Sequence, residues 1–312
     1  MCDTYGNTKE CKSCGNYERC TKSERGRHIS MRKMIFLFIG LVLFLFPQNI
    51  FGEIPEHERK LLIDVWTDFR LGRWHAEEQK LKKLVVSPLE DVVCQARFAE
   101  GCLWQHRQTG KDLKKATDAY KWIVEKYPKN KIAPWALLSI GRIPDLDVLN
   151  PDPESAILIY RRVLTEYPES QAAQEAVLHL AEALFQSRGK KGAMEAVEEL
   201  KKMLVQHPDP QYTAQIHLLL GKLYRYPLED YCQSVNHLSI ALDLGLESLA
   251  QQSTTCLTIA ILADRKLDDR TLAIKYYYRT LKEFPRNDID FLVKQRLKQL
   301  GVPIPKKRFE FE

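Results

Sequence analysis

Glycine is scarce in this sequence, which has 14 glycines among 312 residues. A sheet-rich chain with many tight turns needs more of them, because glycine adopts the positive-φ backbone of those turns without strain. Alanine, leucine, glutamate, lysine and glutamine fill the long middle of the chain instead, and these residues favour helix. The sequence therefore predicts an all-α fold.

Positive charge is sparse outside the N-terminal segment. The net charge is +6, and residues 1–33 hold eight Lys/Arg against four Asp/Glu, a surplus of four. Residues 34–52 hold no charge, so residues 53–312 carry only the remaining +2. Phosphate binding needs a concentrated basic face. We therefore expect no nucleic acid as the main ligand, although a local basic patch remains open.

Motifs of catalysis are also missing from the sequence. It contains no Gly-x4-Gly-Lys-Ser/Thr loop, no His-Glu-x2-His pair and no Gly-x-Ser-x-Gly elbow. Ser187–Gly192 (SRGKKG) has the composition of a phosphate loop without its spacing, and it reads as a solvated turn between helices. Since no acid, base or nucleophile converges, we expect no enzyme, no cofactor and no small-molecule substrate.

Two residue pairs have alternatives that the sequence leaves open. His179 and His217 would lie on neighbouring helices, where surface or groove positions are more common than metal ligands. Cys232 and Cys256 would lie on adjacent helices, either as a disulfide or as two small core residues.

One apolar run interrupts the polar N-terminal region. Met34–Phe46 is 13 residues long and follows Arg32 and Lys33. As a helix it spans about 20 Å, less than the roughly 30 Å of a bilayer core. This length favours a signal peptide that starts at Met31, comprises residues 31–52 and is cleaved off. The alternative is an uncleaved anchor that spans the membrane through residues 34–52, with its basic flank in the cytoplasm. In both cases the rest of the chain is exported, to the periplasm or another extracytoplasmic site.

Residues 1–30 form a polar tail without a periodic apolar face, and we expect them to be disordered or untranslated. Two residues separate Cys11 from Cys14, a spacing that suits thiolate ligation of a metal, but no second pair with this spacing follows. The candidate metal ligands of this tail are Cys11, Cys14, Cys20 and Cys2.

A repeat with a period near 40 residues fills the rest of the chain. Small residues recur with gaps of 40, 40, 40, 38 and 39 residues, and each precedes Tyr or Leu by four positions except the first, Ala76, which precedes Lys80. A proline often follows eight positions after that Tyr or Leu. The positions are Ala76, Ala116, Ala156, Ala196, Ser234 and Ala273. A second series of small residues keeps the same step, at Gly101, Gly141, Ala181, Gly221 and Ala260.

The two series indicate stacked helical hairpins. A small residue lets two helix axes approach closely, the larger residue four positions on fills the space beside it, and proline ends the second helix. This pattern resembles the tetratricopeptide repeat, although its period exceeds the family's usual 34 or so. The Tyr-Pro endings at Pro128 and Pro168 resemble those of exported, envelope-associated bacterial members.

The resemblance implies a right-handed α-α superhelix of about six hairpins over residues 53–302, with a flexible tail over 303–312. We expect Asp288–Leu300 to form a terminal capping helix, whose Phe291, Leu292, Leu297 and Leu300 cover the last repeat.

The resemblance also implies a function. In the family, first helices line a groove, and ligand contacts follow the small residues of those helices. The matching positions here are Arg142, Glu182, Lys222 and Arg225. The expected protein is a non-catalytic scaffold that binds a protein or peptide in a cell-envelope complex. The alternative is a membrane-anchored regulatory protein whose Cys-rich cytoplasmic tail binds metal or senses redox state.

Overall fold

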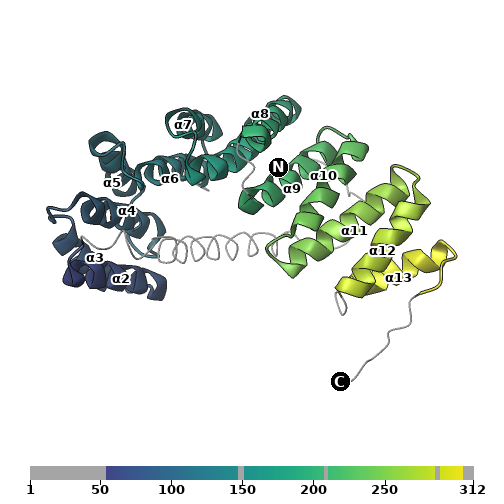
Figure 1. Ribbon diagram of the computed structural model, residues 1–312, viewed down its shortest axis with the longest axis horizontal. Helices are drawn as coiled ribbons and strands as arrows, with labels where there is room; N and C mark the ends of the chain where they lie inside the picture. The colour runs from purple at the N-terminus through teal and green to yellow at the C-terminus, as the bar shows by residue number, and fades with distance from the viewer. Residues whose placement is uncertain (1–53, 147–150, 207–209, 285–288, 305–312) are drawn as a thin grey trace, which may run out of the picture. The chain divides into compact units, whose positions relative to one another are not determined.

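The computed structural model describes residues 54–146, 151–206, 210–284 and 289–304 (Figure 1). In these ranges the chain forms twelve α-helices and no β-strand, which confirms the predicted all-α class. None of these helices has the length and hydrophobicity of a membrane span. The predicted export segment at residues 31–52 and the four cysteines of residues 1–30 lie outside the described residues.

The chain divides into two compact units, residues 1–92 and 93–312. In the first unit, α2 (Glu56–Leu71) and α3 (Trp74–Leu84) form a hairpin around buried Trp66 and Phe69. Ala76 is exposed in α3, whereas the neighbouring Glu77 is fully buried. The first copy of the repeat is therefore a hairpin, but Ala76 is not its close-packed small residue.

The second unit is a series of helical hairpins in which each helix packs against the next. It begins within α4 (Glu90–His106), which crosses the boundary between the units. The remaining helices are α5 (Leu113–Lys126), α6 (Ala133–Leu146), α7 (Pro153–Glu166), α8 (Gln171–Gln206), α9 (Pro210–Arg225), α10 (Tyr231–Leu244), α11 (Leu249–Arg265), α12 (Arg270–Glu283) and α13 (Asp290–Gln299).

Inside the hairpins, small residues of the first helix contact the large residues that follow the small residues of the second helix. A Cβ added to Gly101 would lie 2.3 Å from the Tyr120 ring, and one added to Gly141 would lie 2.7 Å from the Tyr160 ring. Tyr120 and Tyr160 are fully buried. In these two hairpins, and in the one where Gly221 meets Leu238, the residue four positions after the second-helix small residue packs against the first-helix small residue.

A third regularity sets where the second helices begin. The N-cap aspartates of α5, α7, α10 and α12 each accept a hydrogen bond from a backbone N–H three residues on, which satisfies one free donor of the first turn. Each stands four positions before a small residue. These aspartates are Asp112, Asp152, Asp230 and Asp269.

The hairpin that follows α7 has no such aspartate at the start of its second helix. Its two helices form one continuous element, α8, which bends at Gly189 with φ 55° and ψ −129°. A Cβ on Gly192 would lie 1.9 Å from the carbonyl oxygen of Leu184, so the two halves of α8 approach closely here. The predicted turn at Ser187–Gly192 is therefore confirmed, but it is a sharp bend rather than an open loop.

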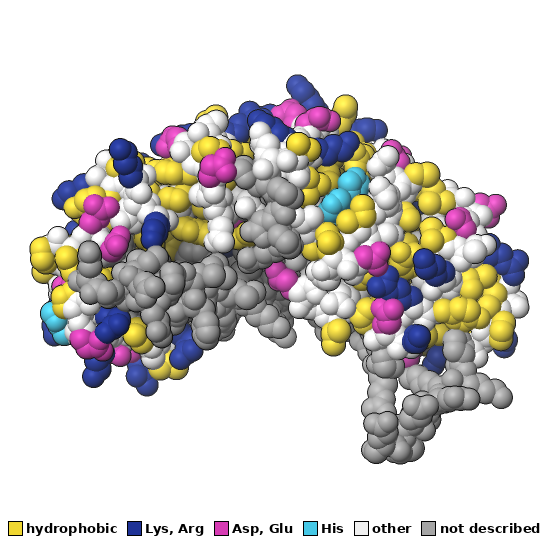
Figure 2. Space-filling model, in the orientation of Figure 1, with side chains coloured by type: hydrophobic (Ala, Val, Ile, Leu, Met, Phe, Trp, Pro, Cys, Tyr) yellow, Lys and Arg dark blue, Asp and Glu magenta, His cyan; other side chains and the backbone are white. Residues whose placement is uncertain are grey.

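The terminal helix α13 covers the last repeat, as predicted, but with only part of the predicted set of side chains. Of that set, Leu297 is buried and Leu300 packs against the core, whereas the other two are exposed. Val293 and Leu297 are fully buried, whereas Phe291 is 72% exposed and Leu292 57% exposed. A bidentate ion pair between Arg296 and Asp264, with distances of 2.6 and 2.8 Å, fixes this rotation of the helix. Hydrophobic side chains accordingly gather at the surface over α12 and α13 (Figure 2).

Candidate partner-binding surface

The first helices of neighbouring hairpins in the second unit lie side by side. α6 contacts α8 as well as α7, and α8 contacts α9. Glu175, His179 and Glu182 follow each other at helical spacing on one face of α8. We define the first-helix surface by this face and its neighbours, namely Arg142, Glu175, His179, Glu182, Phe185, Lys222, Arg225 and Tyr226.

An ion pair joins α6 to α8 within this surface. Arg142 Nη1 lies 3.6 Å from Glu175 Oε1, and the two side chains are only 17% and 14% exposed. Burial raises the pKa of Glu175, but His179, whose Nε2 lies 3.6 Å from Glu175 Oε1, and the charge of Arg142 outweigh burial and hold that pKa below its usual value. Glu175 is therefore ionised and forms an ion pair with Arg142. Because of this pair, Arg142 is less available to a binding partner than its position in the sequence suggests.

The neighbouring histidines are paired differently from the sequence expectation. His179 stacks on Tyr160 of α7, with ring centroids 5.6 Å apart. His217 of α9 contacts His237 of α10, and their Nδ1 atoms are 2.8 Å apart. His179 and His217 thus have separate partners. In the part of the chain that the structure describes, no group of three or more His, Cys, Asp or Glu side chains is placed to hold a metal ion.

Cys232 and Cys256 do not form a disulfide. Cys232 is exposed on α10, whereas Cys256 is buried in α11, where its thiol donates to the carbonyl oxygen of Tyr276 at 3.4 Å. Burial raises the pKa of the Cys256 thiol. The sequence left open either a disulfide or two small core residues for this pair. In the structure Cys256 is a core residue, Cys232 is exposed, and the two form no disulfide.

The other predicted contact residues lie on the same helices as an aromatic pair. Glu182, Lys222 and Arg225 are all exposed. Phe185 and Tyr226 meet edge to face, with centroids 6.2 Å apart; Phe185 is half-buried, and Tyr226 is 66% exposed. The sequence analysis missed this pair, although its members lie four and five positions after the small residues Ala181 and Gly221. Tyrosine and arginine are frequent among residues that dominate binding energy at interfaces.

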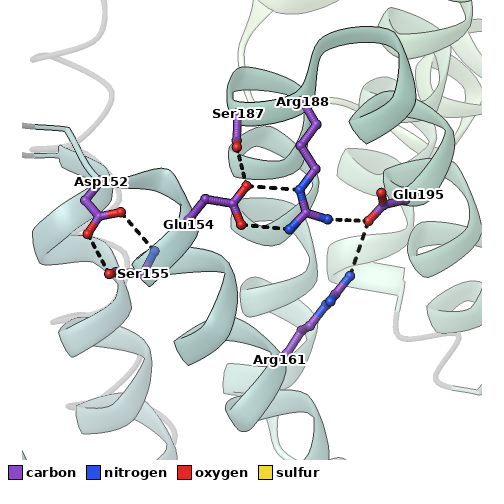
Figure 3. A network of polar contacts seen from close by, with 7 residues as sticks. All are labelled: Asp152, Glu154, Ser155, Arg161, Ser187, Arg188 and Glu195. Carbon is purple, nitrogen blue, oxygen red and sulfur yellow. Dashed lines mark hydrogen bonds and ion pairs between the residues drawn. The ribbon is translucent and has the colours of Figure 1, made fainter.

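A second polar network ties α7 to the bend of α8 (Figure 3). Arg188 binds Glu154 through two contacts of 3.0 and 2.7 Å, and it binds Glu195 at 2.7 Å. Ser187 also donates to Glu154, and Arg161 lies 3.4 Å from Glu195. The hydrogen bonds from Arg188 and Ser187 lower the pKa of Glu154 to about 2. These residues fasten one hairpin to the next, which is a structural role.

Comparison with known proteins supports the fold. No protein-family model matches the sequence, and no match was found among curated proteins. A solved structure titled "Functional Characterization of Pseudomonas Aeruginosa pilF" is similar, with a TM-score of 0.51 and 17% identity over 78% of this chain and 98% of that one. At this identity the similarity concerns the fold alone. Together with the consecutive helical hairpins, it confirms a tetratricopeptide-like solenoid.

Proposed function

We propose that this tetratricopeptide-like chain is a non-catalytic scaffold that binds a protein of a cell-envelope complex through its first-helix surface. Solenoids of this kind present an extended surface built from successive repeats, and they typically serve protein–protein interaction. The observation that supports this site most directly is the contact between half-buried Phe185 and exposed Tyr226, on the helices that carry the exposed charges Glu182, Lys222 and Arg225. An apolar centre with a charged rim has the composition of a protein interface.

The proposal places the repeats outside the cytoplasmic membrane. Its support is the sequence of residues 31–52, whose basic start and apolar run have the order of an export signal. Sequencing the N-terminus of the mature protein tests this part. A mature chain that starts near residue 53 is expected for a cleaved signal. A chain that retains residues 34–52 and partitions with membranes is expected for an anchor, and a soluble chain that retains them would contradict export.

The binding proposal predicts a specific effect of charge reversal. In pull-downs from solubilised envelopes, the K222E/R225E double variant should lose at least about tenfold of the captured partner, since two rim charges change sign. Its matched control is K190E/K191E, which makes the same change at two exposed lysines beside the α8 bend. Equal capture by the wild type and K222E/R225E would remove the first-helix surface as the site.

A further inference from the structure

Two tryptophans of the α4–α5 hairpin are each held between two cations. At Trp104, the guanidinium carbon of Arg107 lies 4.9 Å and Nζ of Lys115 lies 4.2 Å from the ring centroid. Both distances are within the range of cation–π attraction. Since Arg107 follows the last residue of α4 and Lys115 belongs to α5, the ring of Trp104 lies between the two helices near their connection.

The same arrangement recurs about two turns away. The guanidinium carbon of Arg97 lies 5.1 Å and Nζ of Lys126 lies 5.0 Å from the ring centroid of Trp122. Tyr127 extends the aromatic surface, with its ring centroid 5.5 Å from that of Trp122. We call the resulting row the tryptophan–cation strip, consisting of Arg97, Trp104, Arg107, Lys115, Trp122 and Lys126.

The strip is linear and lies apart from the first-helix surface. Lys115, Trp122 and Lys126 are seven and four residues apart, so they share one side of α5 over about 16 Å. His106 lies near Arg142, a member of the first-helix surface, because the charge of that arginine helps to lower the pKa of His106, after the larger effect of burial. Trp104 comes two residues before His106 and so lies about 160° around α4 from that histidine. The strip is therefore on another side of α4 from the first-helix surface.

The charge around the strip is strongly positive. Residues 107–131 contain eight Lys/Arg and three Asp/Glu. The surplus of five exceeds that of the whole stretch 53–312. Arg97 is already paired with Glu100 at 2.7 Å, and Lys115 lies 3.6 Å from Asp112. Lys126 is exposed and forms no ion pair within the described ranges. Of these three cations, Lys126 is therefore the one without an acidic partner within the described ranges, and the surplus of positive charge lies in the residues around it.

The shape of the charged region favours a polypeptide over a bilayer. The adjacent stripe of α5 alternates in sign through Lys114, Asp118, Lys121 and Glu125, so a flat anionic surface would meet cancelling charges there. The large hydrophobic side chains that are exposed in the described residues include none between positions 93 and 157, so this hairpin has no fully exposed apolar anchor for lipid beside its half-buried aromatic rings. A narrow row of cations and rings matches a single extended chain.

The geometry points to a second binding site on this protein, in which the tryptophan–cation strip binds an extended acidic segment of a partner protein. At about 3.3 Å per residue, roughly five residues of such a segment cover the strip. Its carboxylates pair with Lys115 at one end and Lys126 at the other. Its remaining side chains lie on the rings of Trp104 and Trp122. This site is independent of the proposed function of the first-helix surface.

A labelled peptide of alternating glutamate and alanine tests the strip, with the full-length protein kept in a non-ionic detergent and binding followed by fluorescence anisotropy. The K115E/K126E variant should weaken binding by about tenfold or more at low salt. The matched control is K114E/K121E, which reverses two exposed lysines of the same helix on the neighbouring stripe and should weaken binding by less than about threefold. Replacing glutamate by glutamine in the peptide should abolish binding.

Three outcomes would overturn the site. Equal losses in the two double variants would show that net charge, not the strip, governs binding. Absence of measurable peptide binding by the wild type would remove the site altogether. Strip-dependent binding to detergent micelles that contain phosphatidylglycerol, without binding of the peptide, would assign the surface to a membrane instead. Circular dichroism of both variants confirms that each one remains folded.

Discussion

Replacing Tyr160 with alanine is expected to lower the free energy of unfolding by about 3–5 kcal/mol. The ring is fully buried, fills the space beside Gly141 and stacks on His179. Removing it leaves a cavity at the closest approach of α6 and α7, where two helix backbones cannot move together without displacing their other contacts. Urea unfolding followed by circular dichroism measures the loss.

The control for this substitution is Tyr226→Ala, which removes the same atoms from a side chain that is 66% exposed. Its expected cost is below about 0.5 kcal/mol. The comparison separates the loss of the buried contact from the change in residue size. If both variants unfold at the same urea concentration, the contact between Tyr160 and Gly141 does not hold the hairpin together.

Acidification is expected to destabilise the fold through the contact between His217 and His237. Burial lowers the pKa of His237 to about 4, with contributions from the charges of His217 and Lys201, and burial also lowers the pKa of His217. Tyr224 stacks on the His237 ring, with centroids 5.5 Å apart. The Nδ1 atoms form one hydrogen bond, in which one ring must donate and the other accept. Two protonated rings cannot make this contact.

The sign of the pH effect follows from the lowered pKa. Between pH 6.5 and about 4, the unfolded chain binds a proton at His237 that the folded chain does not, so stability falls as the pH falls through this window. The expected loss between about pH 7 and about pH 4.5 is 2–3 kcal/mol for this residue. In the H237Q variant this part of the loss should disappear, as measured by urea unfolding at both values. Wild type and H237Q losing equal stability would contradict the assignment.

The hairpin packing could be predicted because it is encoded locally. The small residues and the Tyr or Leu four positions on recur at fixed spacing, and the structure brings Gly101 against Tyr120 and Gly141 against Tyr160. The N-cap aspartates were an equally regular signal that the sequence analysis overlooked. Their absence at Gly192 also marks the hairpin that has no separate start for its second helix.

The rotation of α13 could not be predicted from its own sequence. The helix has two apolar edges, one with Phe291 and Leu292 and the other with Val293 and Leu297, and both have plausible spacing for burial. The choice depends on Asp264, which lies 32 residues before its partner Arg296 and fixes which edge turns inward. Contacts this distant in sequence leave no local pattern.

The candidate sites also combine features that the repeat spacing predicts with features that it does not predict. The exposed charges Glu182, Lys222 and Arg225 follow from their positions in the repeat, and their exposure agrees with a role at a surface. The pairing of Arg142 with Glu175 and the strip between α4 and α5 depend on which side chains meet across helices. A residue's neighbours in the next helix decide whether its charge is free or occupied, and the repeat spacing does not specify them.

The bend in α8 also constrains how this protein can evolve. At Gly189 the backbone has φ 55° and ψ −129°, which a residue with a side chain adopts only with strain of about 1–3 kcal/mol. At Gly192 a side chain would collide with Leu184. Sequence drift is therefore restricted at the α8 bend, where a side chain at either glycine would strain the backbone or collide with the first half of the helix.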